Sequence, residues 1–577
     1  MANILTMQRL LGFKDFFPNE KPHEKEYYAS KLGKEIIEKS TCFFLSFLRH
    51  KGTPDVNPLL QEWFTFYDFK WFKSPTYWQI EAEYRRIKNH HQGEEHSIIS
   101  VESLLNMFLW VRDNNHVPDI IESHDASSSL PLLELVLLFN DDVLKNYEKA
   151  SQSISQFGDD RKMQRLILAG SFSQSDLINI DYAQLLYTQI YKKAKLLKFI
   201  EAEQKYSHLL AKLLTEFKCD TKEEFLKAVG AAAIIPLKSY RPSWTILSLE
   251  NTPDKEKSSH ILDNLAIGEA EAIIIEQDDY LQLRNKPFQK LSNEEYRIIF
   301  ELFLIKKIYN GLIFKLSSYD KDFLGNIRDD FSEGVLLYET LKFILGNGVS
   351  KIITGNEFKD VGLKREPDFY SRKDNVIMLF ESKDFFMRGE YKLSYDFSII
   401  ERELMKDGRL KKAVTQIVTN IERCLLSEIP LDDIKSIDDK VIIPSIIVHD
   451  SIYSAPALNF WVYYWFIDEL QRVKENPNLK HINFDNIRPI TVIEIDTLIL
   501  YEEQFKNGGF ELVSLIERYH EHVQFSQVNN LPPEKIEEHA LKSAISFSEF
   551  VRYVALSNGV DINFTIISKM LNEFGIK

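Results

Sequence analysis

The chain has 577 residues, of which 44% are hydrophobic, so it is too long for one ordinary domain and rich enough in apolar residues for large cores. Its net charge of −15 excludes a generally basic protein that holds nucleic acid over its whole surface. Three widely spaced cysteines exclude a disulfide framework and a zinc ribbon, and they favour a reducing compartment. With no signal-peptide apolar segment and no long apolar run, we expect a cytoplasmic protein without a membrane partner.

The first part of the chain, residues 1–230, is predicted to be a mostly helical recognition or regulatory region. Apolar residues recur at spacings of three and four in 129–150 and 187–218, with charges between them. Between Trp63 and His91, aromatic residues alternate with lysines and arginines. This pattern fits either base stacking with phosphate contacts or a helix-packing core with a basic rim.

Residues 231–328 form a mixed segment that we expect to pack on the domain that follows. Its start is marked by Gly230 and the prolines at 236 and 242, which are predicted to break the helical pattern. Residues 271–276 read as a strand, and 293–316 as a long apolar element.

The most specific chemical pattern lies between Arg365 and Phe386, in the sequence REPDFYSRKDNVIMLFESKDFF. A short strand after Asp368, a polar turn at 372–375 and an apolar strand at 376–380 predict a β-hairpin. Side chains of a strand alternate between its two faces, so Glu381 and Lys383 point the same way and Ser382 points oppositely. The hairpin then brings Asp368 toward Glu381 and Lys383.

These residue types suit metal-assisted hydrolysis of a phosphodiester. Two carboxylates can hold Mg²⁺, with Mn²⁺ as a substitute, while the ion keeps several waters. Such an ion polarises a phosphate and lowers the pKa of an attacking water, and a neighbouring lysine can orient that water or neutralise charge. The alternative is an ordinary solvated strand end, because aspartate, glutamate and lysine are common residues.

The motif resembles the PD-(D/E)XK nuclease superfamily, which has the restriction-endonuclease-like fold, and the resemblance covers roughly residues 329–500. It implies a mixed sheet between helices, with metal bound by Asp368 and Glu381 and with Lys383 acting on the water. It also implies another acidic metal ligand on the preceding helix, 331–346, where Glu339 is our choice and Glu333 the competitor.

The resemblance further implies a helix after the hairpin that carries a lysine and a glutamine toward the site. The segment 408–426 fits, with an apolar stripe, and with Lys412 and Gln416 four residues apart on one face. Gln416 is therefore a candidate catalytic or phosphate-positioning residue, or else part of a solvated face. Asn420 stands where one exonuclease branch of the family has tyrosine, which disfavours that branch.

The remaining elements complete an α/β core and a tail. Residues 441–451 and 488–500 read as buried strands with an apolar helix between them at 456–473. His449 and Asp450 are interpreted as polar residues at a strand end. Residues 501–577 are predicted to form a helical tail, with prolines at a helix start and Gly559 at a helix end.

The sequence thus predicts a multidomain α+β protein with a helical N-terminal region, a restriction-endonuclease-like core and a helical tail. The expected function is a Mg²⁺-dependent nuclease, with DNA favoured over RNA, of the kind found among restriction and anti-phage effectors. The alternative is a catalytically degenerate nuclease fold that binds nucleic acid or assembles complexes. A phosphate-binding loop of the GxxxxGK[ST] form is absent, so an ATP-driven step would need a separate ATPase partner, and double-strand cleavage would need a homo-oligomer or two sequential nicks.

Overall fold

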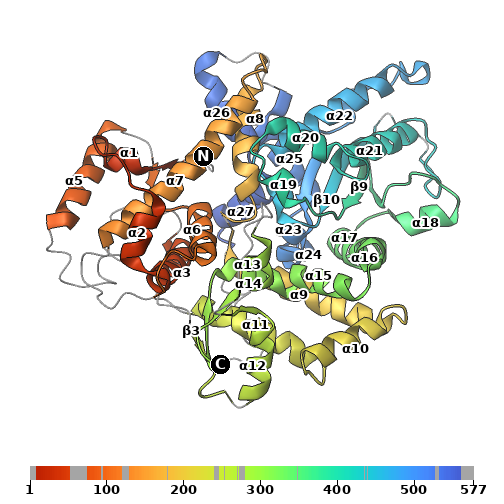
Figure 1. Cartoon of the computed structure of the whole chain (residues 1–577). Helices are drawn as coiled ribbons and strands as arrows, with labels where there is room; N and C mark the ends of the chain where they lie inside the picture. Colours follow the sequence, from red (N-terminus) through yellow and green to blue (C-terminus); the bar gives the residue numbers. More distant parts are fainter. Residues whose placement is uncertain are drawn as a thin grey trace.

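The computed structural model is a mixed α+β protein in which helices surround one five-stranded sheet (Figure 1). It describes residues 8–51, 75–91, 95–119, 129–178, 180–238, 246–252, 254–268, 271, 280–346, 348–434, 436–437, 439–526 and 532–560. The predicted strand at 271–276 and the aromatic–basic stretch before residue 75 lie almost entirely outside these residues.

The N-terminal region is helical in the residues described, as predicted, apart from a parallel pair of short strands. Its elements are β1 (Gln8–Leu10), α1 (Phe13–Phe16), α2 (Lys25–Leu32), α3 (Lys34–Lys51), α5 (Pro75–His90), β2 (Glu95–Ser97), α6 (Val101–Asp113), α7 (Ser129–Ser153), α8 (Lys162–Ser171), η3 (Phe172–Gln174), α9 (Tyr182–Ala202), α10 (Ser207–Glu216) and α11 (Lys222–Lys238).

The sequence suggested a break of the helical pattern at Gly230, but α11 continues through this residue to Lys238. Three alanines follow this glycine, and alanine has the strongest helix propensity, which offsets the cost of one glycine. Pro236 lies in the last turn of α11, although proline cannot donate the backbone hydrogen bond of that position.

The middle of the chain contains a four-stranded sheet in the order β3-β6-β5-β4, followed by a run of helices. Its elements are β3 (Ile246–Ser248), α12 (Lys255–Asp263), β4 (Ala266–Ile267), α13 (Leu281–Asn285), β5 (Phe288–Lys290), β6 (Glu295–Ile298), α14 (Glu301–Ile308), α15 (Asn310–Tyr319), α16 (Phe323–Ile327), η4 (Arg328–Leu337) and α17 (Tyr338–Leu345).

The main sheet has the order β11-β10-β9-β8-β7. Strands β7, β8 and β9 form an antiparallel meander, whereas β9, β10 and β11 are parallel, so this sheet is mixed. Its elements and crossovers are β7 (Lys351–Thr354), α18 (Gly355–Asp360), β8 (Phe369–Lys373), β9 (Val376–Lys383), α19 (Gly389–Lys392), α20 (Phe397–Leu404), α21 (Leu410–Leu425), β10 (Val441–Val448), η5 (Ser451–Ser454), α22 (Leu458–Lys474), η6 (Pro477–Leu479), η7 (Phe484–Asn486) and β11 (Thr491–Glu494).

Helices cover both faces of this sheet. Helix α21 packs on β9 and β10, on the face to which Tyr370 points, and its predicted apolar stripe is buried there. Phe369 points to the opposite face, where its ring lies 6.2 Å from that of Tyr338 in α17. The predicted hairpin, the helix between the strands and the mixed sheet are therefore present.

The last predicted strand is shorter than expected. Only Thr491–Glu494 forms β11, and the chain turns at once into α23 (Ile495–Leu500). The cause is Asp496, which is buried and pairs with Lys192 of α9 at 2.7 Å and accepts a hydrogen bond from Thr188 at 2.8 Å. These partners in α9 outweigh the strand propensity of the β-branched residues around Asp496.

The C-terminal part is helical, as predicted, in α24 (Glu502–Lys506), α25 (Leu512–Val523), α26 (Pro533–Ser543) and α27 (Phe547–Ser557). Helix α27 ends next to Gly559, whose φ of +72° favours glycine. Among the residues described, no helix has the length and apolar character needed to cross a membrane.

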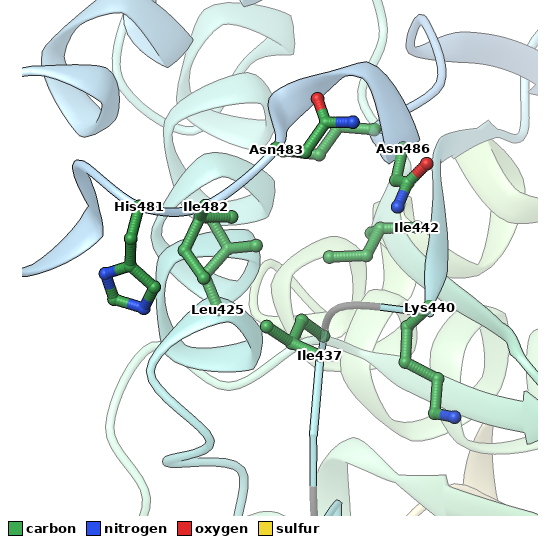
Figure 2. A pocket seen from close by; sticks show the side chains of 9 residues that line it. Leu425, Ile437, Lys440, Ile442, His481, Ile482, Asn483 and Asn486 are labelled. Atoms are coloured by element: carbon green, nitrogen blue, oxygen red, sulfur yellow. The ribbon is translucent and has the colours of Figure 1, made fainter.

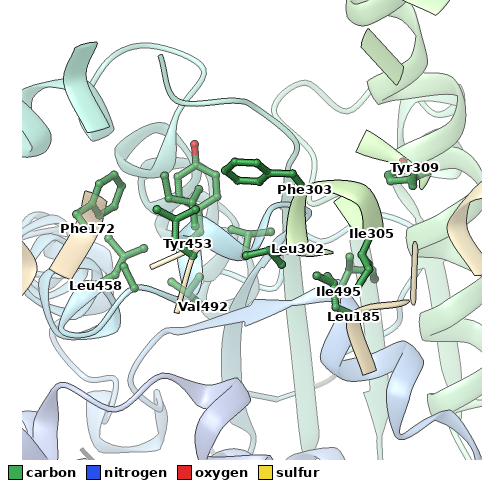
Figure 3. Packing of buried hydrophobic residues seen from close by; sticks show 14 of the residues in the cluster. Phe172, Leu185, Leu302, Phe303, Ile305, Tyr309, Tyr453, Leu458, Val492 and Ile495 are labelled. Carbon is green, nitrogen blue, oxygen red and sulfur yellow. The ribbon is translucent and has the colours of Figure 1, made fainter. Parts of the chain in front are cut away.

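One continuous hydrophobic cluster joins the ranges that the sequence separates. Figure 3 shows Leu302 and Phe303 of α14 beside Tyr453 of η5, and Leu185 of α9 beside Ile495 of α23. Helix α14 of the middle segment therefore lies beside η5, the element that follows β10. Burial of these large side chains removes apolar area from water, at about 25 cal/mol per Å².

The buried histidine of α25 makes stability depend on pH. His520 contacts Thr491 at 2.8 Å, and burial, with Arg488 nearby, lowers its pKa to about 3. Unfolded histidine titrates near 6.5, so the unfolded state binds more protons between these values, and stability falls as pH drops below about 6.5. This fall in the free energy of unfolding reaches up to about 1.4 kcal/mol per pH unit, and we expect it to be absent in His520→Gln.

Denaturant unfolding of both proteins from pH 7 to 5 checks this expectation. The readout is the change with pH of the difference between the two unfolding free energies, which cancels the titration of all other groups. A difference that stays constant across this range would contradict a buried, neutral His520.

Candidate metal and phosphate site

The two strands of the hairpin place Asp368 opposite Glu381. Phe369 pairs with Phe380, so the residue before β8 lies across from the residue after Phe380. The backbone N–H of Ser382 donates to Asp368 Oδ2 at 2.6 Å and fixes this carboxylate at the strand end. Gly355 donates its N–H to the carbonyl of Asp368 at 2.8 Å, and a Cβ at this glycine would lie 3.2 Å from that oxygen.

Glu381 and Lys383 point to the same face of β9, as predicted, and form an ion pair of 2.8 Å. Their side chains are 1% and 13% exposed, so the pair lies almost entirely out of water. Glu381 Oε2 is buried and makes no hydrogen bond in the part of the chain that the structure describes. A buried carboxylate oxygen without a partner is costly and indicates a missing donor or cation.

The third carboxylate of the cluster is Glu333, and not Glu339, our first choice. Glu333 lies in η4, where Tyr338 donates its hydroxyl to Glu333 Oε1 at 2.8 Å, and its charge acts on Asp368, Glu381 and Lys383. Glu339 is 57% exposed and pairs with Lys195 of α9.

The glutamate of the cluster lies in an unusual helix. Residues Arg328–Leu337, which include Glu333, form a π-helix, whereas Glu339 lies in the α-helix that follows. The sequence left both glutamates as candidates. Wide turns of this kind are frequent at functional sites.

Two further charged residues border the cluster: Glu366, the first residue of the motif, and Lys359, which lies outside it. Lys359 of α18 lies 3.7 Å from Glu333 Oε1 and 3.6 Å from Glu366 Oε1. Helix α18 begins at Thr354, whose hydroxyl and backbone N–H form a reciprocal capping box with Glu357. That capping box, TGNE, is a signal in the sequence for the helix, although it does not reveal the contact of Lys359.

The carboxylates hold their protons more tightly than isolated groups do. Burial, with the charges of Glu381 and Glu333, raises the pKa of Asp368 well above its ordinary value. Burial also raises the pKa of Glu381 to about 7, although Lys383 opposes this shift. The pKa of Glu333 is raised, mainly by burial. Buried acids that repel one another in this way are typical of functional sites.

Lys383 itself stays protonated in this arrangement. Burial alone would lower the pKa of its ammonium, but Glu381 and Asp368 more than compensate and raise it above the ordinary value. The side chain therefore presents a positive charge to the cluster rather than a free amine.

Helix α21 supports the loop in front of Asp368. Asn420 donates to the carbonyl of Arg365 at 3.1 Å, and Arg423 donates to the same oxygen at 2.9 Å. Arg365 has a φ of +56°, a strained value that these two bonds stabilise. Asn420 therefore acts on the backbone of the loop.

Gln416 lies one turn earlier on α21 and is half-buried. Its side-chain amide makes no hydrogen bond within the described part of the chain, so no contact links it to the carboxylates. Lys412 is 44% exposed and pairs with Asp407, so it lies on the outer surface.

His449 and Ser382 form a separate pair. Ser382 Oγ lies 2.9 Å from His449 Nε2, on the face of the sheet opposite to Glu381 and Lys383. Burial lowers the pKa of His449, so the ring is neutral. This pair matches the interpretation of His449 as a polar residue at a strand end.

By themselves, the side chains of the cluster supply only some of the ligands that a hard divalent cation needs. Within the residues described, no three acidic, histidine or cysteine side chains are arranged closely enough to enclose a metal ion. The unpartnered oxygen of Glu381 and the mutual repulsion of the carboxylates nevertheless suit Mg²⁺, which binds through one or two carboxylates and takes water and phosphate oxygens as its other ligands.

A small cavity of about 120 Å³ lies at the other end of the sheet (Figure 2). Leu425 at the end of α21 and Ile442 at the start of β10 line it, together with Lys440, Ile482 and Asn486. Glu381 and Lys383 pair instead with Ile446 and Val448 at the far end of β10. The cavity is therefore separate from the cluster.

The comparisons with known proteins assign no family to this chain. No family model, no curated protein and no solved structure matches it.

Proposed function

We propose that the chain is a metal-dependent nuclease that hydrolyses phosphodiester bonds in nucleic acid, with DNA as the favoured substrate. The observation that carries this proposal is the buried oxygen of Glu381, which has no hydrogen-bond partner among the described residues and lies among repelling carboxylates beside Lys383.

Asp368 and Glu381 would hold the ion, with Glu333 adding negative charge beside them, and with Mg²⁺ as the physiological metal and Mn²⁺ as a substitute. When bound, the ion would polarise the scissile phosphate and lower the pKa of a water molecule. Lys383 would orient that water and neutralise the negative charge that develops on the phosphate oxygens. Ser382 and Tyr338 keep two of the carboxylates in place through the bonds described above.

The arrangement of the main sheet supports the resemblance to PD-(D/E)XK nucleases. The acidic hairpin, the mixed sheet between helices and the helix after the hairpin are the parts that the resemblance implies. The division of the chain into a nuclease domain at 329–500 with helical regions on both sides belongs to the same proposal. We further propose a role as a restriction or anti-phage effector, in which the helical regions provide recognition or control.

A cytoplasmic location is part of this proposal. All three cysteines, Cys42, Cys219 and Cys424, are buried and unpaired, which suits a reducing compartment. The net charge of −15 opposes tight binding of nucleic acid by the surface as a whole, so affinity would depend on a local patch or on a partner chain.

The proposal is tested by a cleavage assay with wild type, Lys383→Ala and Lys412→Ala. Each protein is incubated with supercoiled plasmid, single-stranded DNA or single-stranded RNA, in Mg²⁺, Mn²⁺ or EDTA. We expect metal-dependent cleavage that falls at least about 100-fold in Lys383→Ala, because a charge-stabilising group near the phosphate is lost. Lys412→Ala is the matched control and should retain the wild-type rate, since this lysine is exposed and pairs only with Asp407.

Equal cleavage by wild type and Lys383→Ala would place the activity elsewhere and contradict the proposal. An absence of cleavage of all three substrates would favour the degenerate, nucleic-acid-binding alternative. Cleavage of RNA alone would correct the substrate and leave the site in place.

A further inference from the structure

The charges of the cluster leave room for one divalent ion. Four carboxylates, from Glu333, Glu366, Asp368 and Glu381, interact with two ammonium groups, from Lys359 and Lys383. These carboxylates outnumber the two ammonium groups, so a divalent cation would relieve the repulsion among them.

Lys359 is held between two carboxylates rather than bonded to one. Its ammonium lies 3.7 Å from Glu333 and 3.6 Å from Glu366, beyond hydrogen-bond length from either oxygen. Both carboxylates are nearly enclosed, with side chains 15% and 13% exposed, whereas Lys359 is 49% exposed. The lysine thus closes the solvent side of the cluster.

The charge of Lys359 also acts on the inner part of the cluster. Although burial opposes its charge, Glu333, Glu366 and Asp368 together raise the pKa of this ammonium above its ordinary value. An ordinary surface ion pair contributes little and involves one partner. Lys359 instead interacts with three acids that all belong to the site.

The inner part of the cluster contains a carboxylate oxygen that makes no hydrogen bond among the described residues. Glu381 is 1% exposed, and its Oε2 atom has no hydrogen-bond partner among the described residues. Lys383 is engaged with the other oxygen of this carboxylate at 2.8 Å. An incoming cation would therefore meet an unpartnered oxygen beside Asp368, and an ammonium group already present between Glu333 and Glu366.

We propose that Lys359 is a resident cation that takes the place of a second metal ion, so that the site binds one divalent ion, on its Asp368–Glu381 side. This inference rests on the metal-dependent function proposed above. Lys359 holds a fixed positive charge at the solvent side, where it meets the phosphate backbone of the substrate.

The test counts bound Mn²⁺ by the loss of its free-ion electron paramagnetic resonance signal, without substrate. Wild type, Lys359→Met and Lys359→Arg are titrated, and a Glu381→Gln protein measures binding elsewhere on the acidic surface, which is subtracted. We expect one site-specific ion for wild type and two for Lys359→Met, because the methionine leaves Glu333 and Glu366 without a cation. Lys359→Arg keeps the positive charge and should bind one.

The outcomes separate this inference from the proposed function. Two site-specific ions in wild type, or one in Lys359→Met, would overturn the role of Lys359 and leave the metal site standing. No site-specific ion in wild type would overturn both. Circular dichroism and thermal unfolding of the four proteins verify that they fold. Because Lys359 is half-exposed on a short surface helix, its variants should fold as wild type does.

Discussion

Asp176→Asn is expected to lower the free energy of unfolding by about 3–5 kcal/mol, because it removes the anion that the buried Lys306 and Lys392 share with the partly buried Arg284. Asp176 follows η3 and is 6% exposed. Its carboxylate pairs with Lys306 at 3.0 Å and Arg284 at 3.2 Å, and also with Lys392. These charges lower its pKa well below the ordinary value despite burial.

The position of this cluster explains the size of the effect. Arg284 and Lys306 come from α13 and α14 of the middle segment, whereas Lys392 ends α19, shortly after the acidic strand β9. Asp450 is half-buried nearby, and with a raised pKa it can compensate only part of the lost charge. The variant should therefore loosen the attachment of the helical regions to the main sheet.

Equilibrium unfolding in urea, with Asp407→Asn as the control, measures this effect. Asp407 is 88% exposed and pairs with Lys412, so its loss should cost less than about 0.5 kcal/mol. A destabilisation below about 1 kcal/mol in Asp176→Asn would show that the three cations do not depend on this carboxylate.

Asp368→Asn should have opposite effects on activity and on stability. Cleavage should fall by about 1000-fold or more, since a charged metal ligand becomes a neutral amide. In the absence of metal the variant should be more stable, on the order of 1 kcal/mol, because the amide removes the repulsion with Glu381 and Glu333. Asparagine keeps an oxygen that can accept the Ser382 N–H bond.

Asp432→Asn is the matched control, because Asp432 lies in the segment after α21 and contacts strand β8 without belonging to the cluster. Asp432 accepts hydrogen bonds from Arg372 at 2.7 and 2.8 Å and from Tyr370 at 2.6 Å, and its pKa is lowered although burial opposes this shift. Its replacement should destabilise the protein by at least about 2 kcal/mol and leave the acidic cluster in place. Thermal unfolding in EDTA, with and without added Mn²⁺, compares the two variants.

If Asp368→Asn unfolds at a lower temperature than wild type in EDTA, the carboxylate has a structural role and the functional interpretation is wrong. If the variant gains as much stability from Mn²⁺ as wild type does, Asp368 does not hold the ion.

Local sequence patterns were sufficient for the elements that carry the site. The turn at Asp374 and the apolar run before Glu381 predicted the hairpin, and alternation along the strand placed Glu381 and Lys383 on one face. The apolar stripe of the segment 408–426 predicted helix α21 in the same way. In each case, the period of the backbone relates sequence spacing to a shared face.

Patterns of this kind failed where distant partners decide the conformation. Strand β11 ends before Asp496 because this residue bonds to Lys192 and Thr188 of α9. These partners lie about 300 residues earlier in the chain. Glu333, rather than Glu339, joins the acidic cluster, because Glu339 instead pairs with Lys195 of α9.

The sequence by itself determined the acidic hairpin, the faces of its side chains and the mixed α+β class, because these follow from local periodicity. Only the tertiary structure decided which further charges meet there. Lys359 and Glu333 approach the cluster from α18 and η4, and their contacts depend on how helices pack on the sheet. Electrostatic interactions between residues far apart in sequence have no periodic signal, so the chain must fold before they can be identified.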